Sequence, residues 1–148
     1  MIQIQFACEC DRVVADESQA RRAVESILRD AGVQRGSVSV AIVDDPTIHE
    51  LNRRYLEHDY PTDVLSFLLE RAGDSLEGEV VVSADTAQRT ALRLGWPAEH
   101  ELLLYIVHGT LHLVGYDDLD PDSKACMRQQ ERRVLERAGI EARYDHVE

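Results

Sequence analysis

The sequence predicts an α+β domain in which a small mixed sheet of about four strands packs against helices. Short alternating or continuous apolar stretches, typical of strands, occur mostly in the first part of the chain, whereas helical periodicity dominates the second part. The expected order of elements is β-α-β-α-β-β-α-α-α. A chain of 148 residues is long enough for one core and short for two, so residues 1–148 are expected to form a single domain.

The first three elements alternate between strand and helix. IQIQFAC, at 2–8, alternates apolar and polar residues as a half-buried strand does. The next segment has a cap candidate at Asp16, apolar residues at helical spacing and a stop at Gly32, which predicts an amphipathic helix. The run at 37–43 begins by alternating and becomes continuously apolar, which indicates a strand that is buried further along.

A short helix and a hairpin are expected next. Asp45 and Pro46 look like a cap followed by proline at the first helical position, and the helix should continue to about Tyr55. Two further strands, 63–69 and 78–83, are separated by the segment RAGDSLE. They predict an antiparallel hairpin with a longish loop.

Three helices should complete the chain. The first is expected at 83–94, before Gly95, and Pro97 opens the second. The second helix is apolar nearly all round, so it should be buried. The third is expected at 120–139, starting from an Asp-Pro pair.

Composition narrows the class of protein. With 16 Lys and Arg against 28 Asp and Glu, the net charge of −12 opposes non-specific attraction to nucleic acid or an anionic membrane, so a polyanionic substrate needs a local basic patch. The start has no secretory signal pattern, and no run is long enough to span a membrane. Three cysteines, Cys8, Cys10 and Cys126, do not suggest a disulfide framework. A cytoplasmic protein with no membrane partner and no organic cofactor is expected.

The segment HGTLHLVGYDD places two histidines four residues apart on the apolar helix. His108 and His112 would therefore lie on one helical face. Buried imidazoles need partners, and a shared metal ion satisfies both; the alternative is a pair of core histidines bonded to backbone carbonyls. The sequence favours a metal site of the kind that zincins build on a helix.

A third ligand is expected shortly after the helix. Gly115 can adopt the left-handed conformation that reverses the chain, which would bring Asp118 back towards the histidines. Two histidines and one carboxylate leave a coordination position open, as catalytic zinc requires. Asp117 is the competing ligand; otherwise it is a turn residue or an acceptor for a ligand N–H.

This segment resembles the signature HGxLHLxGYDH of the YbeY family of bacterial endoribonucleases that mature rRNA. Two more blocks support the resemblance: LNRRYLEHDYPTDVLSF is similar to LNxxYRxxDxPTDVLSF, and LEGEVVVS is similar to a GDIxIS strand. Glu101 and Met127 also agree with it. The resemblance implies a cytoplasmic, zinc-dependent, single-strand-specific endoribonuclease in 16S rRNA 3′-end maturation and ribosome quality control. Its implied partners are rRNA and the small ribosomal subunit or ribosome-assembly factors.

Two positions depart from the family pattern. Asp118 replaces the third histidine, and Leu56 replaces the arginine that follows the tyrosine. A carboxylate is an ordinary zinc ligand, but its charge should make the metal a poorer Lewis acid and Mn²⁺ or Fe²⁺ more plausible. Leucine cannot bind phosphate. Arg53 and Arg54 could serve instead, or they could form an exposed helical face paired with Glu50 or Glu57.

Residues beyond the metal ligands are weaker candidates. Asp63 and Ser66 could lie beside the metal, although loop capping and sheet pairing explain them too. No general base is assigned, because Gly109 stands where zincin peptidases carry their glutamate. Trp96 and Tyr116 could stack on bases, although packing explains Trp96 better.

Two groups of arginines could form the required basic patch. The last helix carries four and the helix before Gly95 carries two; Glu131 and Glu136 suggest instead a solvated face with intrahelical pairs. The arginines are Arg128, Arg132, Arg133 and Arg137, and Arg89 and Arg93.

Two other functions fit part of the pattern. The histidine spacing also suits a zincin-like metallopeptidase or other metallohydrolase. A non-catalytic ribosome-associated factor with a structural metal would explain the loss of the arginine and of the third histidine.

Overall fold

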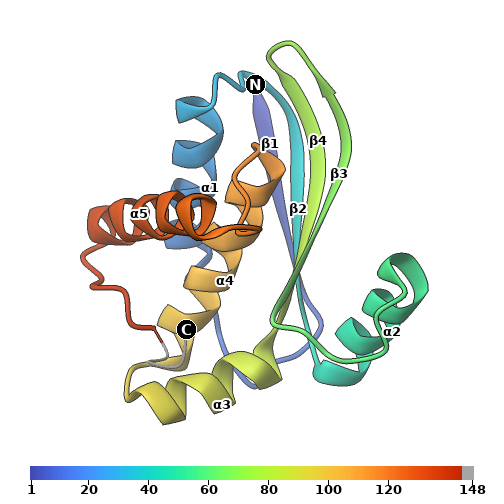
Figure 1. Cartoon of the computed structure of the whole chain (residues 1–148), viewed down its shortest axis with the longest axis vertical. Coiled ribbons are helices and arrows are strands. Elements are labelled where there is room, and N and C mark those ends of the chain that lie inside the picture. Colours follow the sequence, from blue (N-terminus) through green and yellow to red (C-terminus); the bar gives the residue numbers. More distant parts are fainter. Residues whose placement is uncertain (145–148) are drawn as a thin grey trace.

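In residues 1–144, four strands form one sheet, and five helices pack around it (Figure 1). The structure is a computed structural model and describes residues 1–144. The strands are β1 (Ile2–Cys8), β2 (Arg35–Val43), β3 (Val64–Ala72) and β4 (Ser75–Ser83). The helices are α1 (Glu17–Asp30), α2 (Asp45–Leu56), α3 (Ala84–Leu94), α4 (Ala98–Leu113) and α5 (Pro121–Arg137). The predicted α+β class and order of elements are confirmed.

The sheet is mixed, as expected. Its strand order is β1-β2-β4-β3; β2 pairs in parallel with β1 and β4, and β3 pairs antiparallel with β4. Helix α1 connects β1 to β2, and α2 followed by β3 connects β2 to β4, since parallel strands require a crossover. The edge strand β3 contacts α4, the helix that carries both histidines.

The main core lies between the sheet and α1, α3, α4 and α5, and α4 runs through it. Nearly every side of α4 is covered: eleven of its sixteen residues are buried. A smaller cluster on the other face of the sheet holds Val43, Leu65 and Val81 against Ile48 of α2. In the part of the chain that the structure describes, no helix combines the length and apolarity needed to cross a bilayer.

The hairpin is tighter than the sequence suggested. The prediction of a longish loop at RAGDSLE is wrong. Strand β3 continues to Ala72 and β4 begins at Ser75, so the connection consists of Gly73 and Asp74. Gly73 has a φ of 59°, a conformation that glycine adopts without steric cost and that a two-residue hairpin turn needs. A register irregularity between Leu68 and Glu70 accompanies the long pairing.

The start of α2 also differs from the prediction by one residue. Asp44, not Asp45, is the N-cap, and its side chain accepts a hydrogen bond from the Thr47 amide. Asp45 lies inside the first turn, where it accepts hydrogen bonds from the hydroxyls of Ser83 and Thr86. These bonds tie the start of α2 to the junction between β4 and α3.

Candidate metal centre and adjoining clefts

The two histidines of α4 face the same point. Their Nε2 atoms are 3.0 Å apart, and both side chains are partly exposed on a helix that is otherwise buried. Helical spacing brings residues four apart to one face. Within residues 1–144, the two imidazole nitrogens therefore converge on a side of α4 that is open to solvent near the end of the helix.

Asp118 completes the group after a chain reversal. Gly115 has a φ of 106°, the left-handed conformation that the sequence predicted, and the loop returns over the helix end. The Asp118 carboxylate lies 3.7 Å from His108 Nε2 and 3.9 Å from His112 Nε2. Within residues 1–144, these three side chains bring their ligand atoms within 4.8 Å of one another.

Asp117 has a different role in the structure. Its Oδ1 accepts a hydrogen bond from the Leu119 amide at 3.2 Å, so its carboxylate orders the turn. Among the described residues, it does not join the convergent group. The geometry thus favours Asp118 over Asp117 as the third ligand.

A buried carboxylate from α5 holds His108 in place. Glu131 Oε2 lies 2.6 Å from His108 Nδ1, and the Glu131 side chain is fully buried. Its Oε1 accepts hydrogen bonds from Tyr144 at 2.8 Å and from Arg128 at 3.1 Å. This network holds the imidazole so that Nε2 of His108 points towards Asp118. A carboxylate that bonds the other ring nitrogen orients metal-binding histidines in the same way.

The two imidazoles differ in their affinity for protons. Burial opposes protonation of His108, but the hydrogen bond and the charge of Glu131 outweigh it and raise the pKa of His108. Burial, aided by the positive charge of His108, lowers the pKa of His112. The neutral form of His112, which offers the lone pair that a metal needs, is therefore favoured near neutral pH.

Gly109 is explained by close packing against the sheet. A β-carbon there would lie 2.6 Å from Val80 Cγ1, 2.9 Å from Val64 Cγ2 and 3.1 Å from Ser66 Oγ. The hydroxyl of Ser66 donates a hydrogen bond to the Gly109 carbonyl at 2.8 Å. Position 109 thus faces β3 and β4 and has no room for a catalytic glutamate.

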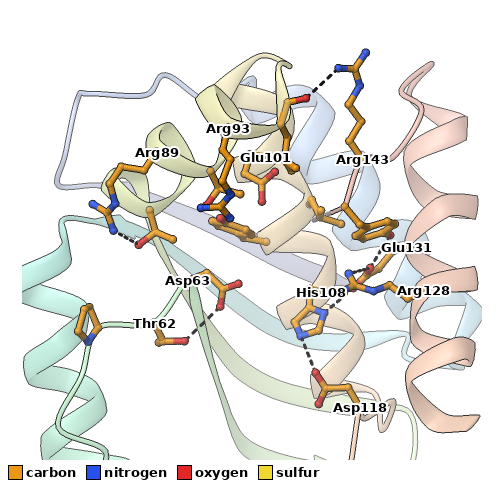
Figure 2. Close-up of a pocket in the computed structure, with 17 residues that line it drawn as sticks. Thr62, Asp63, Arg89, Arg93, Glu101, His108, Asp118, Arg128, Glu131 and Arg143 are labelled. Carbon is orange, nitrogen blue, oxygen red and sulfur yellow. Dashed lines mark hydrogen bonds and ion pairs between the residues drawn. The ribbon is translucent and has the colours of Figure 1, made fainter. Parts of the chain in front are cut away.

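A cleft of about 510 Å³ opens beside His108 (Figure 2). His108, Asp118 and Glu131 line it together with Asp63 and Glu101. Arginines from three parts of the chain also line it, namely Arg89 and Arg93 of α3, Arg128 of α5, and Arg143. Of the arginines that the sequence offered for a basic patch, both of the α3 group and one of the α5 group line this cleft, and they share it with four acidic residues.

A second cleft, of about 500 Å³, lies beside both histidines. It shares Thr62, Asp63, His108 and Asp118 with the first, and Ser66 also lines it. Leu56, at the position of the family's arginine, lies on its wall. Asp63 and Ser66 are thus both beside the metal group, where the sequence placed them as weak candidates.

Arg53 and Arg54 lie elsewhere. Arg53 makes a close ion pair with Glu50 at 2.7 Å, and Arg54 lies 3.8 Å from the same carboxylate. Within residues 1–144, neither arginine lines either cleft. They form the exposed, paired helical face that was the alternative to phosphate binding.

The rest of the α5 arginines also serve structural contacts. Arg133 and Arg137 both pair with Asp30 of α1, and Arg132 lies over the Tyr144 ring. The expectation of a wholly solvated face is wrong for Glu131, because α5 turns this residue into the core beside α4. Glu136 is exposed, as expected.

Some site residues could not be assigned from sequence reasoning. Glu131 follows Met127 by four residues and precedes Val134 by three, so it lies on the same helical face as these apolar residues. A glutamate on an apolar helical face was the signal that could have identified Glu131 as buried. Arg143 and Tyr144 follow the last helix and carried no such signal. Trp96 is buried and donates from Nε1 to Glu101 at 2.8 Å, which makes it a packing residue. Tyr116 packs partly buried against the core.

Comparison with known proteins decides the family. A sequence model described as endoribonuclease YbeY matches residues 5–139. The endoribonuclease YbeY of Rhodopirellula baltica is 46% identical over 144 residues, covering 95% of this chain and 71% of that protein. This chain belongs to the endoribonuclease YbeY family.

Further relatives agree with this assignment. The endoribonuclease YbeY of Syntrophus aciditrophicus is 38% identical over 131 residues, covering 84% of this chain and 82% of that protein. The solution structure of TM1509 from Thermotoga maritima has a TM-score of 0.64 and 26% identity, covering 100% of this chain and 99% of the other. The predicted family, fold class and enzyme class, an endoribonuclease, are confirmed.

Proposed function

We propose that this YbeY-family chain is a metal-dependent endoribonuclease specific for single strands, acting as one domain over residues 1–148. We further propose that it works in the cytoplasm in 16S rRNA 3′-end maturation and ribosome quality control. Its partners would be rRNA and the small ribosomal subunit or ribosome-assembly factors. The observation that carries the proposal is the convergence of His108, His112 and Asp118 at the meeting point of two clefts.

The donor set suits one zinc ion per chain. Two imidazole nitrogens and one carboxylate oxygen are ordinary zinc ligands, and their spacing leaves them facing one point. Asp118 in place of histidine adds negative charge, so Mn²⁺ or Fe²⁺ are alternative occupants. A zinc ion bound there would polarise a phosphoryl oxygen or lower the pKa of a bound water.

The chain's own residues supply orientation and access. Glu131 fixes the tautomer of His108 by accepting from Nδ1, so that Nε2 stays available as a ligand. The arginines of the first cleft provide positive charge next to the metal group for the phosphodiester. The open clefts on both sides favour a catalytic site over a closed structural one.

A peptidase fits the structure poorly. Zincin peptidases place a glutamate after the first histidine, and position 109 here is packed against Val80 and Val64. A non-catalytic factor with a structural metal remains the contrasting outcome of the test below.

The test combines metal analysis with RNA cleavage. Protein purified without a His tag should contain about one metal ion per chain. The wild type should cleave a single-stranded RNA spanning the 3′ end of 16S rRNA and leave the same sequence in a duplex intact. His112→Ala should abolish cleavage, whereas His49→Ala, a surface residue paired with Asp59, should not change it.

Other outcomes would replace the proposal. Cleavage of casein without cleavage of RNA would indicate a metallopeptidase. Stoichiometric metal without turnover, with a melting temperature that falls on chelation, would indicate a structural metal.

A further inference from the structure

The metal-ligand group lies where two clefts with different linings meet. Both clefts are lined by Thr62, Asp63, His108 and Asp118, so a molecule that passes the ligand group can enter both. Their volumes are about 510 and 500 Å³. Because the two clefts share these four residues, a chain-like ligand can run from one cleft into the other across the metal-ligand group.

The first cleft carries guanidinium groups that are held in place. Arg89 pairs with Asp45 at 2.8 Å, and Arg143 donates to the carbonyl oxygens of Leu94 and Gly95 at 3.2 and 2.8 Å. The guanidinium carbon of Arg128 lies 3.9 Å from the centre of the Tyr144 ring. Arginines fixed by such contacts lose little freedom when they bind phosphate oxygens.

Four carboxyl groups share this cleft with the four arginines, and their roles differ. Glu131 is engaged by His108 and Arg128, and burial raises the pKa of Glu101, which favours its neutral form. Asp118 belongs to the metal-ligand group. Of the acidic residues lining the cleft, this leaves exposed Asp63 opposite the arginines of α3 (Figure 2). Four guanidinium groups therefore line one cleft in a chain whose net charge is −12.

The second cleft has an apolar wall instead. Leu56 and Leu68 line it and are 42% and 52% exposed, and Val64 and Leu113 also line it. Apolar side chains left exposed at a cleft provide area for the face of a base or a ribose and no charge for a phosphate. Leu56, at the position where the family has arginine, makes this side of the group unsuited to phosphate.

We propose that one RNA strand crosses the metal-ligand group with its phosphates in the arginine-lined cleft and a nucleobase against Leu56 and Leu68. This strand path rests on the proposed endoribonuclease function. It assigns the phosphate contact of this chain to Arg93 and its neighbours, across the group from residue 56. A duplex keeps its bases paired inside, so it could not place one in the apolar cleft; the path therefore accounts for single-strand specificity.

The phosphate side is tested by binding to metal-free protein, which separates binding from cleavage. A short fluorescein-labelled single-stranded RNA is titrated with EDTA-treated protein at several salt concentrations, and fluorescence anisotropy is measured. Arg93→Gln and Arg143→Gln should each weaken binding about tenfold and reduce the log–log salt slope by about 0.7. Arg133→Gln, whose residue pairs with Asp30 away from the clefts, should match the wild type.

The base side is tested with the same assay. Leu68→Asn should weaken binding several-fold and leave the salt slope unchanged, because it removes apolar area and no charge. An abasic nucleotide at the contacted position should remove the difference between this variant and the wild type. Leu92→Asn, on the exposed surface of α3 and outside both clefts, is the matched control.

The possible results separate the strand path from the proposed function. The path is overturned if Arg93→Gln and Arg143→Gln bind like the wild type, if Arg133→Gln loses as much affinity as they do, or if the metal-free wild type does not bind RNA. Binding that follows the expected pattern supports the path even if zinc-loaded protein does not cleave, and in that case only the proposed function fails. If zinc-loaded protein cleaves RNA but the arginine variants bind RNA like the wild type, the proposed function is supported and the strand path is rejected.

Discussion

Replacing Glu131 by glutamine tests how α5 controls the metal centre. The carboxylate accepts three hydrogen bonds, from His108, Tyr144 and Arg128, at 2.6, 2.8 and 3.1 Å. With Nε2 of His108 on a metal, Nδ1 carries the proton and must donate. Glutamine has one acceptor oxygen, so it can face His108 or the Arg128 and Tyr144 pair, but its amide group then opposes a donor on the other side.

The expected cost follows from this count. One charge-assisted hydrogen bond is lost, which is worth about 1.5–3 kcal/mol. Loss of a carboxylate behind a metal-bound histidine typically lowers metal affinity about 10–100-fold, or about 1.4–2.7 kcal/mol, which is the same range. We therefore expect Glu131→Gln to weaken zinc binding by one to two powers of ten, with a folded, monodisperse protein.

Zinc affinity is measured by competition with a chromophoric chelator, and folding by circular dichroism and urea unfolding of the metal-free protein. Glu136→Gln, an exposed glutamate on the same helix, is the control for charge loss. If Glu131→Gln folds and binds zinc as tightly as the wild type, then Glu131 does not orient His108, and the role assigned to it is wrong.

Three further changes probe the site and the core. Asp118→His restores the family residue and should raise both zinc affinity and the cleavage rate; no change in either, by the same competition and cleavage assays, would exclude Asp118 as a ligand. Gly109→Ala should lower the free energy of unfolding by up to about 2 kcal/mol, because overpacking against Val80 costs about 1–3 kcal/mol and the gain in helix propensity returns about 1 kcal/mol. In urea unfolding, the same substitution in a Val80→Ala protein should cost less. Equal losses with and without Val80→Ala would contradict the packing explanation. Burial raises the pKa of Glu101 in the folded protein, so the contribution of this side chain to stability is present below its unfolded pKa and is lost as pH rises through its folded pKa. Glu101→Gln should therefore stabilise the metal-free protein more at pH 8 than at pH 5 in urea unfolding. An equal effect at both pH values would refute this.

The parts of the site that depend on local chain geometry could be predicted from the sequence. Residues four apart on a helix share a face, so the approach of His108 and His112 followed from spacing alone. The reversal at Gly115 and the return of Asp118 followed from the chemistry of helix ends. The burial of α4 followed from its apolar circumference.

The parts that depend on long-range packing could not be predicted. Glu131 meets His108 because α5 crosses α4, and no local pattern specifies that crossing. Arg143 reaches the first cleft from a segment with no regular structure after α5. The hairpin was misjudged because Gly73 and Asp74 resemble a loop, while the residues around them continue the pairing of β3 with β4.

The two departures from the family pattern have different structural consequences. Asp118 lies where the sequence predicted, and its carboxylate places negative charge at the ligand group where the family pattern has a histidine. Leu56 alters the wall of a cleft, and on the opposite side of the same group the arginines of α3 and α5 provide the positive charge that this wall lacks. In the proposed enzyme, the first change would therefore bear on the strength of the metal as a Lewis acid, and the second on where the phosphates of the substrate lie. Because the two effects act on different steps, Asp118→His should change the rate of cleavage, whereas variants of the arginine-lined cleft should change the binding of RNA.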